Sequence, residues 1–204
     1  MAIKNLIAKK NIDFLFVGLD FEVPLFAKYK EEIESESECI VIVSPPQIVE
    51  ICNDKWLTFL FLVENGFAAP KSCLPHDIRA FRANVPFPWI IKPRIGSTSN
   101  DLFRVNTNDE LKHALKKCNN AIIQEEVGKS SDEFTCGIIS TQTEIISSIA
   151  LRRTLKNGNT QMAIYEKNTD LDNHIRDIAS SLGSFGQINI QLRLTEEGPK
   201  VFEI

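Results

Sequence analysis

The last eighteen residues of the chain constrain the fold most strongly, because apolar and polar side chains alternate along them. From Ile188 to Leu194 every second residue is apolar, which is the pattern of a strand with one buried face. Residues 196–198, Glu-Glu-Gly, are predicted to form a three-residue loop with glycine at the position that needs a positive φ. Residues 187–204 are therefore predicted to form a β-hairpin.

The expected hairpin places two polar side chains opposite each other. If it is centred on Glu197, Gln191 lies across from Glu203 on the polar face, with the Cβ atoms about 4.5–5.5 Å apart. An amide oxygen and a carboxylate at that spacing are hard ligands of the kind that Mg²⁺ uses together with a nucleotide. A surface hairpin with ordinary polar side chains explains the same pattern, and the hairpin alone leaves both interpretations open.

The composition is that of a soluble globular protein, with 43% hydrophobic and 25% charged residues and a net charge of −4. The sequence has no long basic block, which argues against a nucleic-acid partner. No run approaches the ~20 apolar residues of a membrane span, and the N-terminus lacks a signal-peptide core. The five cysteines are unpaired in spacing and fit a reducing compartment. We expect a cytoplasmic protein without a nucleic-acid or membrane partner; the oligomeric state is not indicated.

The first 50 residues read as a strand, a helix and a second strand. Residues 13–18 and 39–44 are short apolar runs of strand length, and Pro24 fits the first turn of a helix between them. This order implies a parallel crossover connection. We expect residues 1–53 to be part of a small parallel α/β domain.

The rest of the chain mixes helices with short strands. Asn53-Asp54 can cap a helix that runs to Asn65 and stops at Gly66. Residues 152–160 are polar and are predicted to form a loop. The other predicted elements are strands over 89–92, 102–105, 121–124, 133–139 and 144–149, a helix opened by the capping box Thr107–Glu110, and a last helix capped by Asp170 and closed by Gly183.

One segment has the chemistry of a phosphate-binding loop. Lys92 lies on a predicted strand, next to a loop of small residues that includes Gly96 and Ser97. Free backbone N–H groups, hydroxyl groups and a lysine suit a polyphosphate. The loop matches neither the Walker A pattern nor the dinucleotide fingerprint, and a flexible hairpin turn is the alternative.

Three further positions could contact a nucleotide. The strand exit at Glu125 and Val127 could offer backbone groups to adenine, and Glu133 could accept hydrogen bonds from a ribose diol. Arg153, next to Arg152, could neutralise phosphate oxygens in a transition state. The alternatives are a plain strand-to-loop junction, a strand start in water and a pair of solvated arginines.

Taken in order, these segments resemble the ATP-grasp superfamily, and they are similar to the ATP-grasp domain of the carbamoyl-phosphate synthase large subunit. The resemblance spans about residues 54–204. It rests on the following segments in this order: Asn53-Asp54-Lys55, Gly66 with Pro70, Ile91-Lys92-Pro93 with Gly96-Ser97, Gln124-Glu125 with Gly128 and Glu133, Asn189-Ile190-Gln191, and Phe202-Glu203-Ile204.

The resemblance implies an α/β fold, namely a two-lobed α+β ATP-grasp domain over 54–204, preceded by the partial small domain over 1–53. A lid-like subdomain would cover about 86–127. The ligands would be ATP and Mg²⁺ or Mn²⁺. The implied roles are Lys92 and Lys55 at the phosphates, Gly96 and Ser97 in the phosphate loop, Glu125 and Val127 beside adenine, Glu133 at ribose, Gln191 and Glu203 at the metal, and Arg153 as the catalytic residue near the γ-phosphate.

The family's chemistry implies a ligase that joins a small-molecule carboxylate to an amine or thiol through an acyl phosphate. Two departures leave open whether this chain is itself an enzyme. Asp101 stands where the family usually has a second glycine, and the Asn-Pro-Arg that follows Phe-Glu-Ile in the family is absent after Ile204. We therefore expect a C-terminally incomplete ATP-grasp domain. A non-catalytic or degenerate nucleotide-binding module is the alternative.

Overall fold

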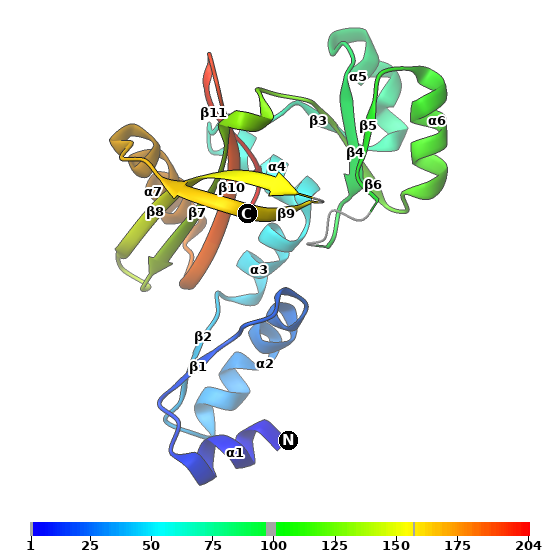
Figure 1. The fold of residues 1–204 in the computed structure, drawn as a ribbon. Coiled ribbons are helices and arrows are strands. Elements are labelled where there is room, and N and C mark those ends of the chain that lie inside the picture. The colour runs from blue at the N-terminus through cyan, green and yellow to red at the C-terminus, as the bar shows by residue number, and fades with distance from the viewer. Residues whose placement is uncertain (1, 97–100, 157) are drawn as a thin grey trace.

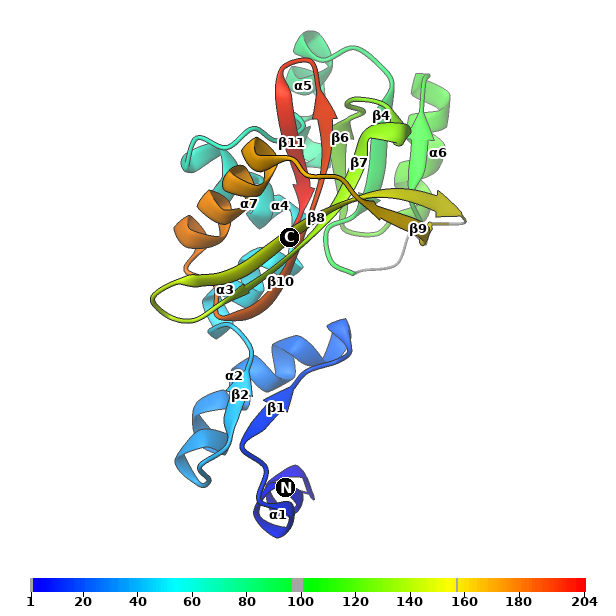
Figure 2. The same ribbon diagram turned by 60° about the vertical axis from the view of Figure 1, so that its left-hand side comes forward.

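The computed structural model describes residues 2–96, 101–156 and 158–204, which form three units (Figures 1 and 2). An N-terminal unit lies below the rest of the molecule in both views. Above it lie a five-stranded sheet, on which the chain ends after β11, and a four-stranded sheet. Each unit has its own hydrophobic cluster of buried residues.

The N-terminal unit contains the predicted strand–helix–strand arrangement. The strands are parallel, with Phe14 paired to Ile40, and Pro24 lies in the first turn of the connecting helix. The prediction is confirmed, and a further helix precedes it. The elements are α1 (Ala2–Lys10), β1 (Phe14–Phe16), η1 (Asp20–Glu22), α2 (Val23–Ser35) and β2 (Ile40–Ile42).

Two consecutive helices, α3 (Pro46–Asn53) and α4 (Lys55–Glu64), connect this unit to the two sheets. Asp54 separates them and caps α4, because its carboxylate accepts a hydrogen bond of 2.9 Å from the Trp56 N–H. The predicted cap is therefore confirmed, and the helix ends before Gly66, whose φ is +77°.

The four-stranded sheet has the order β3-β6-β4-β5, and all neighbouring strands are antiparallel. Trp89 and Ile91 of its central strand are fully buried against helices on one face. Thr107 caps α6 by accepting from the Glu110 N–H, as predicted. The elements are β3 (Ser72–Cys73), η2 (Pro75–Asp77), α5 (Ile78–Asn84), β4 (Trp89–Pro93), β5 (Phe103–Val105), α6 (Asn108–Lys117) and β6 (Ala121–Glu125).

The five-stranded sheet is antiparallel with the order β11-β10-β7-β8-β9. Its core joins Phe134, Ile190 and Leu192 of the sheet to Ile175 of α7 and Leu62 of α4, all of them fully buried. The elements are η3 (Ser130–Asp132), β7 (Glu133–Ser140), β8 (Ile145–Lys156), β9 (Asn159–Tyr165), α7 (Thr169–Leu182), β10 (Gly186–Thr195) and β11 (Gly198–Glu203).

Two predictions about this part of the chain are wrong, one about a strand and one about a helix cap. The loop predicted over 152–160 is wrong, because residues 152–156 belong to β8 and residues 159–160 belong to β9, and these two strands pair. Strand β9 is an edge strand with every residue exposed, so no buried face marks it in the sequence. The cap of α7 is Asn168, whose side chain accepts from the Leu171 N–H at 3.0 Å, and Asp170 lies inside the first turn instead.

The molecule is thus an α/β protein in which a small parallel sheet precedes two antiparallel sheets, as predicted. The four-stranded sheet also takes in β3, which lies before the predicted subdomain at about 86–127. Across residues 2–96, 101–156 and 158–204, no helix combines the length and the hydrophobicity that a membrane span needs.

Candidate nucleotide and metal site

The β10–β11 hairpin brings Gln191 and Glu203 opposite each other, as expected. The predicted three-residue loop over 196–198 is wrong. Thr195 pairs with Gly198, so the turn contains only Glu196 and Glu197. A shift of register between Gln191 and Leu192 leaves one extra residue on β11 and restores the expected pair. The hairpin therefore presents an amide and a carboxylate side by side at the end of β11.

Lys55 lies at the first position of α4 and connects three segments. Its ammonium group contacts the Glu203 carboxylate at 3.0 Å and donates to the Gly96 carbonyl oxygen at 2.6 Å. The neighbouring cap, Asp54, also accepts from Arg94 of the four-stranded-sheet segment at 3.0 Å. These contacts hold the start of α4, the end of β11 and the start of the predicted phosphate loop together.

Lys92 of β4 is buried and points at the hairpin. Its Nζ atom donates to the Phe202 carbonyl oxygen at 3.4 Å and lies 5.2 Å from the centre of the Phe202 ring. Burial lowers the pKa of Lys92 from 10.5 to about 8, and the nearby Glu203 carboxylate partly opposes this shift. The lysine on the four-stranded sheet thus reaches the end of β11 at Phe202, the residue before Glu203.

Glu133 is buried between two arginines. Its carboxylate accepts from Arg153 at 2.7 Å and from Arg193 at 2.9 Å. Arg153 also donates to the Gln191 amide oxygen at 2.7 Å. The structure thus joins three predicted site residues, Glu133, Arg153 and Gln191, in one hydrogen-bonded network. Arg193 was not predicted, although it follows Gln191 by two residues on the same polar face of β10 and could have been found by that periodicity.

The strand exit after β6 packs on the same network at its far end. The Val127 carbonyl oxygen accepts from Arg193 at 3.1 Å. Glu125 lies apart from the cations described above, because its carboxylate accepts from the Lys71 N–H at 2.9 Å and lies 3.8 Å from Lys200. Of the two residues predicted to lie beside adenine, Val127 is therefore hydrogen-bonded to Arg193 of this network, whereas Glu125 contacts Lys71 and Lys200 outside it.

The predicted phosphate loop is only partly described. Gly96 has a φ of +115°, whereas Ser97 lies outside the described residues. Asp101, which stands where a second glycine was expected, has a φ of +62°. Aspartate is one of the few residues that tolerate this left-handed conformation, so the backbone keeps the shape that glycine would give it.

The electrostatic character of the site follows from these residues. Lys92 interacts electrostatically with Glu203, Lys55, Glu133 and Arg193. With Arg153, the cluster contains four cations and two carboxylates, which leaves a formal surplus of two positive charges. A partly buried surplus of this sign favours a polyanionic ligand such as a polyphosphate. We call these six residues the cation cluster.

The oxygens of Gln191 and Glu203 fit a hard divalent cation that a phosphate also ligates. Magnesium keeps several waters and uses one or two carboxylates together with substrate phosphates. In the described residues no group of three or more His, Cys, Asp or Glu side chains could hold a metal alone. The donor set is thus suited to a metal that enters with a nucleotide.

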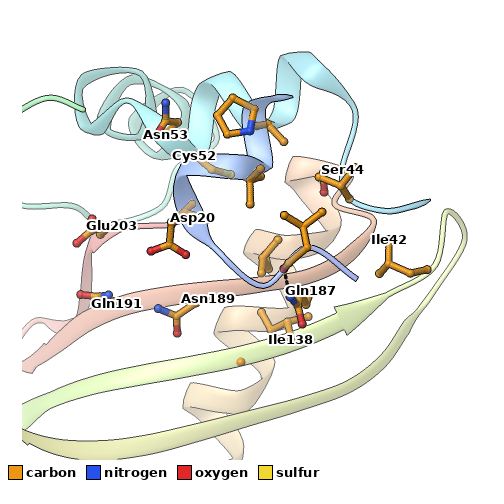
Figure 3. A pocket seen from close by; sticks show the side chains of 18 of the residues that line it. Asp20, Ile42, Ser44, Cys52, Asn53, Ile138, Gln187, Asn189, Gln191 and Glu203 are labelled. Atoms are coloured by element: carbon orange, nitrogen blue, oxygen red, sulfur yellow. Dashed lines mark hydrogen bonds between the residues drawn. The ribbon is translucent and has the colours of Figure 1, made fainter. Parts of the chain in front are cut away.

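A cavity of about 830 Å³ adjoins the cation cluster between the N-terminal unit and the five-stranded sheet (Figure 3). Lys55, Gly96, Gln191 and Glu203 line one end of it, so it shares a wall with the cluster. Cys52 also lines the cavity, but burial raises the pKa of its thiol to about 12, so it is a neutral thiol near pH 7. We call this space the N-terminal cavity.

The fold and the site define a two-lobed α/β protein with surplus positive charge between its two antiparallel sheets. The chain belongs to the ATP-grasp family, because the family model described as ATP-grasp domain matches residues 52–204. The resemblance seen in the sequence is thereby confirmed.

Individual relatives agree with this assignment. The chain is 22% identical to a carbamoyl-phosphate synthase of Methanobrevibacter smithii over 98% of its own length, and it spans 58% of that protein. Its structure is similar to the biotin carboxylase domain of the Hydrogenobacter thermophilus 2-oxoglutarate carboxylase, with a TM-score of 0.77, 10% identity and coverage of 99% of this chain and 49% of the other. For an L-amino acid ligase from Bacillus licheniformis the values are 0.73, 20%, 98% and 50%.

Proposed function

We propose that this chain is the nucleotide-binding part of a Mg·ATP-dependent ligase that joins a carboxylate to an amine or a thiol. The observation that carries the proposal is the surplus positive charge of the cation cluster beside the oxygens of Gln191 and Glu203. The substrate carboxylate would take the γ-phosphoryl group of ATP, giving ADP and an acyl phosphate. The amine or thiol would then displace phosphate to form the amide or thioester.

The proposed catalysis consists of positioning and charge neutralisation, with no covalent bond to the protein. Lys92 and Lys55 would hold phosphate oxygens, with Gly96 and Ser97 in the loop that covers them. Arg153 would stabilise the negative charge on the transferred phosphoryl group, because Glu133 and Gln191 fix its guanidinium in place. The buried position of Lys92 strengthens its interaction with phosphate, since little water screens it.

The proposed nucleoside contacts are Glu125 and Val127 beside adenine and Glu133 at ribose. Glu133 already accepts from two arginines, so a ribose hydroxyl would use a lone pair that these bonds leave free. Gln191 and Glu203 would hold Mg²⁺, or Mn²⁺, which when bound neutralises phosphate charge. The biotin carboxylase neighbour, whose structure is described as a complex with MgADP and bicarbonate, supports ATP and Mg²⁺ as ligands.

The proposal includes the domain assignment and the location. Residues 1–53 would be part of a preceding α/β domain, and residues 54–204 would belong to the ATP-grasp domain, with a lid-like subdomain at about 86–127. The match of the family model to residues 52–204 supports the first boundary. A cytoplasmic location is supported by the free thiols of the five cysteines.

A non-catalytic nucleotide-binding module is a second candidate. It is favoured by the contacts of the two metal-binding candidates, because Glu203 is paired with Lys55 and Gln191 accepts from Arg153. A module of this kind would bind nucleotide with the same affinity whether or not Mg²⁺ is present. Release of ADP and phosphate in the presence of acceptor substrates would exclude it.

Adjacent arginines provide a matched test by titration with Mg·ADP. Arg153 belongs to the cation cluster, whereas Arg152 is held by Asp132 and Glu166 at 2.9 and 2.8 Å. Arg153→Ala is expected to weaken Mg·ADP binding at least tenfold, and Arg152→Ala less than threefold, in line with the loss of one charge-assisted hydrogen bond. Equal effects of the two substitutions would mean that the nucleotide binds elsewhere.

A second titration tests the metal ligands. Glu203→Gln is expected to weaken ADP binding when Mg²⁺ is present and to strengthen it in EDTA, because the metal-bound complex uses that carboxylate, whereas a metal-free nucleotide competes with it for Lys55. An equal loss under both conditions would assign Glu203 to the positioning of Lys55 instead of to the metal.

A further inference from the structure

A short segment, residues 126–129, carries the chain from β6 of the four-stranded sheet to η3 and β7 of the five-stranded sheet. Hydrogen bonds to both sheets fix this segment on either side of Val127. The Glu126 N–H donates to the carbonyl oxygen of Pro88, the residue before β4, at 3.1 Å, and the Val127 carbonyl oxygen accepts from Arg193 of β10 at 3.1 Å. The backbone at Val127 is therefore held from both sheets.

The glycine that follows Val127 brings the segment into close contact with β10. Gly128 has a φ of +59°, and a Cβ atom at this position would lie 3.1 Å from the Leu194 carbonyl oxygen and 3.4 Å from the Arg193 Cβ atom. Glycine is the residue that allows both this backbone conformation and this close approach. The position of the segment is thus set by β10, at the residue that also bonds to Val127.

Arg193 is itself held rigidly. Its Nε atom donates to one oxygen of the Glu133 carboxylate at 2.9 Å, while Arg153 donates to the other oxygen. Glu133 is buried, so this pair is shielded from water. The planar guanidinium of Arg193 presents its donors in fixed directions and can hold Glu133 and the Val127 carbonyl at a set distance from each other. One side chain therefore connects the residue proposed at ribose to the residue proposed beside adenine.

The N–H group of Val127 is a free donor on this fixed backbone. It has no hydrogen-bond partner among the residues that the structure describes, and Val127 is half-buried. A donor held in place selects a ligand atom that accepts a hydrogen bond. Adenine has an acceptor nitrogen in its six-membered ring where hypoxanthine has an N–H group. A base of the second kind would leave two donors facing each other, and unpaired polar groups are costly.

We infer that Arg193 is a positioning residue that makes the site select adenine. It acts through Val127, whose carbonyl it holds so that the Val127 N–H points at the acceptor nitrogen of the base. This inference rests on the proposed function. The role is distinct from the contribution of Arg193 to the charge of the cation cluster, because a lysine would supply the same charge without the two fixed bonds.

Calorimetric titration with the magnesium complexes of ADP, inosine diphosphate and pyrophosphate tests the inference. Wild-type chain is expected to bind ADP at least fivefold more tightly than inosine diphosphate, whose base is hypoxanthine. Arg193→Lys keeps the charge and removes the planar group. It is expected to weaken ADP binding about three- to tenfold, the effect of one hydrogen bond, and to reduce the preference for ADP to below twofold. Pyrophosphate affinity is expected to stay within twofold, because that ligand has no base.

Arg104→Lys is the matched control, since it makes the same change at an arginine that contacts the same segment. Arg104 donates to the Glu126 carboxylate at 2.7 Å and has no hydrogen bond to Val127 among the described residues. All three affinities are expected to stay within twofold in this variant. Gly128→Ala displaces the segment from β10 without any change of charge. It is expected to reduce the preference for ADP as Arg193→Lys does, and it tests the same contact if the lysine variant does not fold.

The outcomes separate this inference from the proposed function. A preference for ADP that is unchanged in Arg193→Lys and Gly128→Ala, or that falls equally in Arg104→Lys, would overturn the inference. Wild-type chain that binds ADP and inosine diphosphate equally well would also overturn it and would leave the proposed function standing. Wild-type chain that binds neither Mg·ADP nor magnesium pyrophosphate would overturn the proposed function, and the inference with it.

Discussion

The buried Lys92 predicts that nucleotide affinity depends on pH in a range where few other groups titrate. Burial holds the pKa of the free lysine at about 8, so its ammonium form is half populated there at pH 8. Phosphate oxygens next to the ammonium group would favour its charged form and raise this pKa in the complex. The chain should therefore take up about half a proton for each Mg·ADP that it binds at pH 8.

The magnitude follows from the fraction of Lys92 that is charged in the free chain. About nine tenths is charged at pH 7 and about one tenth at pH 9, because each pH unit beyond the pKa changes the ratio tenfold. If the lysine stays charged in the complex, the Kd for Mg·ADP rises about tenfold between pH 7 and pH 9, or about 1.4 kcal/mol. The phosphates of ADP are ionised throughout this range, with a last pKa of about 6, and contribute no slope.

Lys92→Met is the matched variant, because it keeps the length of the side chain and removes the titrating group. Calorimetric titration of both chains at pH 7, 8 and 9 gives the slope, and repetition in buffers of different ionisation enthalpy counts the protons taken up. The variant is expected to bind weakly at every pH, with a flat profile. A wild-type profile that is flat within twofold, or an equal slope in the variant, would refute the proposed contact between Lys92 and phosphate.

Stability should change with pH in the opposite direction to affinity. Between pH 8 and 10.5 the unfolded chain binds more protons than the folded chain, because the pKa of Lys92 is about 8 when folded and 10.5 when unfolded. The burial cost of the ammonium group, up to about 3 kcal/mol, is present below pH 8 and is lost as the pH rises through this window. Lys92→Met should therefore raise the melting temperature at pH 7 and lose its advantage at pH 10.

Three further substitutions test the packing that holds the site. Glu133→Gln leaves its two arginine partners without a carboxylate and is expected to cost about 3 kcal/mol in urea unfolding; a cost below 1 kcal/mol would contradict the buried network. Leu62→Ala empties a fully buried position in the core beneath the five-stranded sheet, and urea unfolding should report a loss of about 2–5 kcal/mol. Gly186→Ala places a Cβ 2.8 Å from the Ile42 Cγ2 atom at a φ of +80°. We expect a loss of about 1–3 kcal/mol and faster amide exchange in β2; unchanged exchange would mean that the two units do not pack at this glycine.

The sequence predicts well those elements whose signals lie within a few residues of one another. The capped start of α6 depends on Thr107 and Glu110, three positions apart, and the structure has the same bond. The buried face of β10 follows from a two-residue period that the core then uses at Ile190 and Leu192. In both cases the residues that determine the element lie close together in the sequence. The tertiary contacts of the structure agree with the local pattern.

Elements that tertiary contacts decide are predicted poorly. Strand β9 has no buried face, since it lies at the edge of the sheet with both faces in water. It forms because β8 offers a row of backbone hydrogen-bonding groups. A polar segment without alternating apolar residues gives no sign in the sequence that it will pair with β8. The cap of α7 is similar, because Asn168 and Asp170 are both good caps, and the position of Leu171 in the core selects the first of them.

The pairing of Gln191 with Glu203 combines both cases. The two-residue turn alone would pair Gln191 with Phe202, and the extra residue on β11 moves the pairing on by one. Phe202 is that extra residue, and its carbonyl oxygen and ring both contact Lys92. The register at the candidate metal site is therefore coupled to a lysine from the other sheet, which lies about 110 residues away in the sequence. The hairpin sequence carries no signal for such a bulge.

The charges of the cation cluster connect these observations to ligand binding. Without a ligand, Lys55 is paired with Glu203, and two arginines share Glu133, so the two carboxylates compensate half of the positive charge of the cluster. A nucleotide without metal would compete with these carboxylates for the same cations. A magnesium–nucleoside triphosphate carries about two negative charges once the charge of the ion is counted, which equals the uncompensated surplus. Under the proposed function, the site would accept that complex by breaking only the Lys55–Glu203 pair, as Glu203 turns toward the metal, and would keep the two arginine pairs of Glu133. Lys55 would then be released to the phosphates, so metal binding and phosphate binding would reinforce each other.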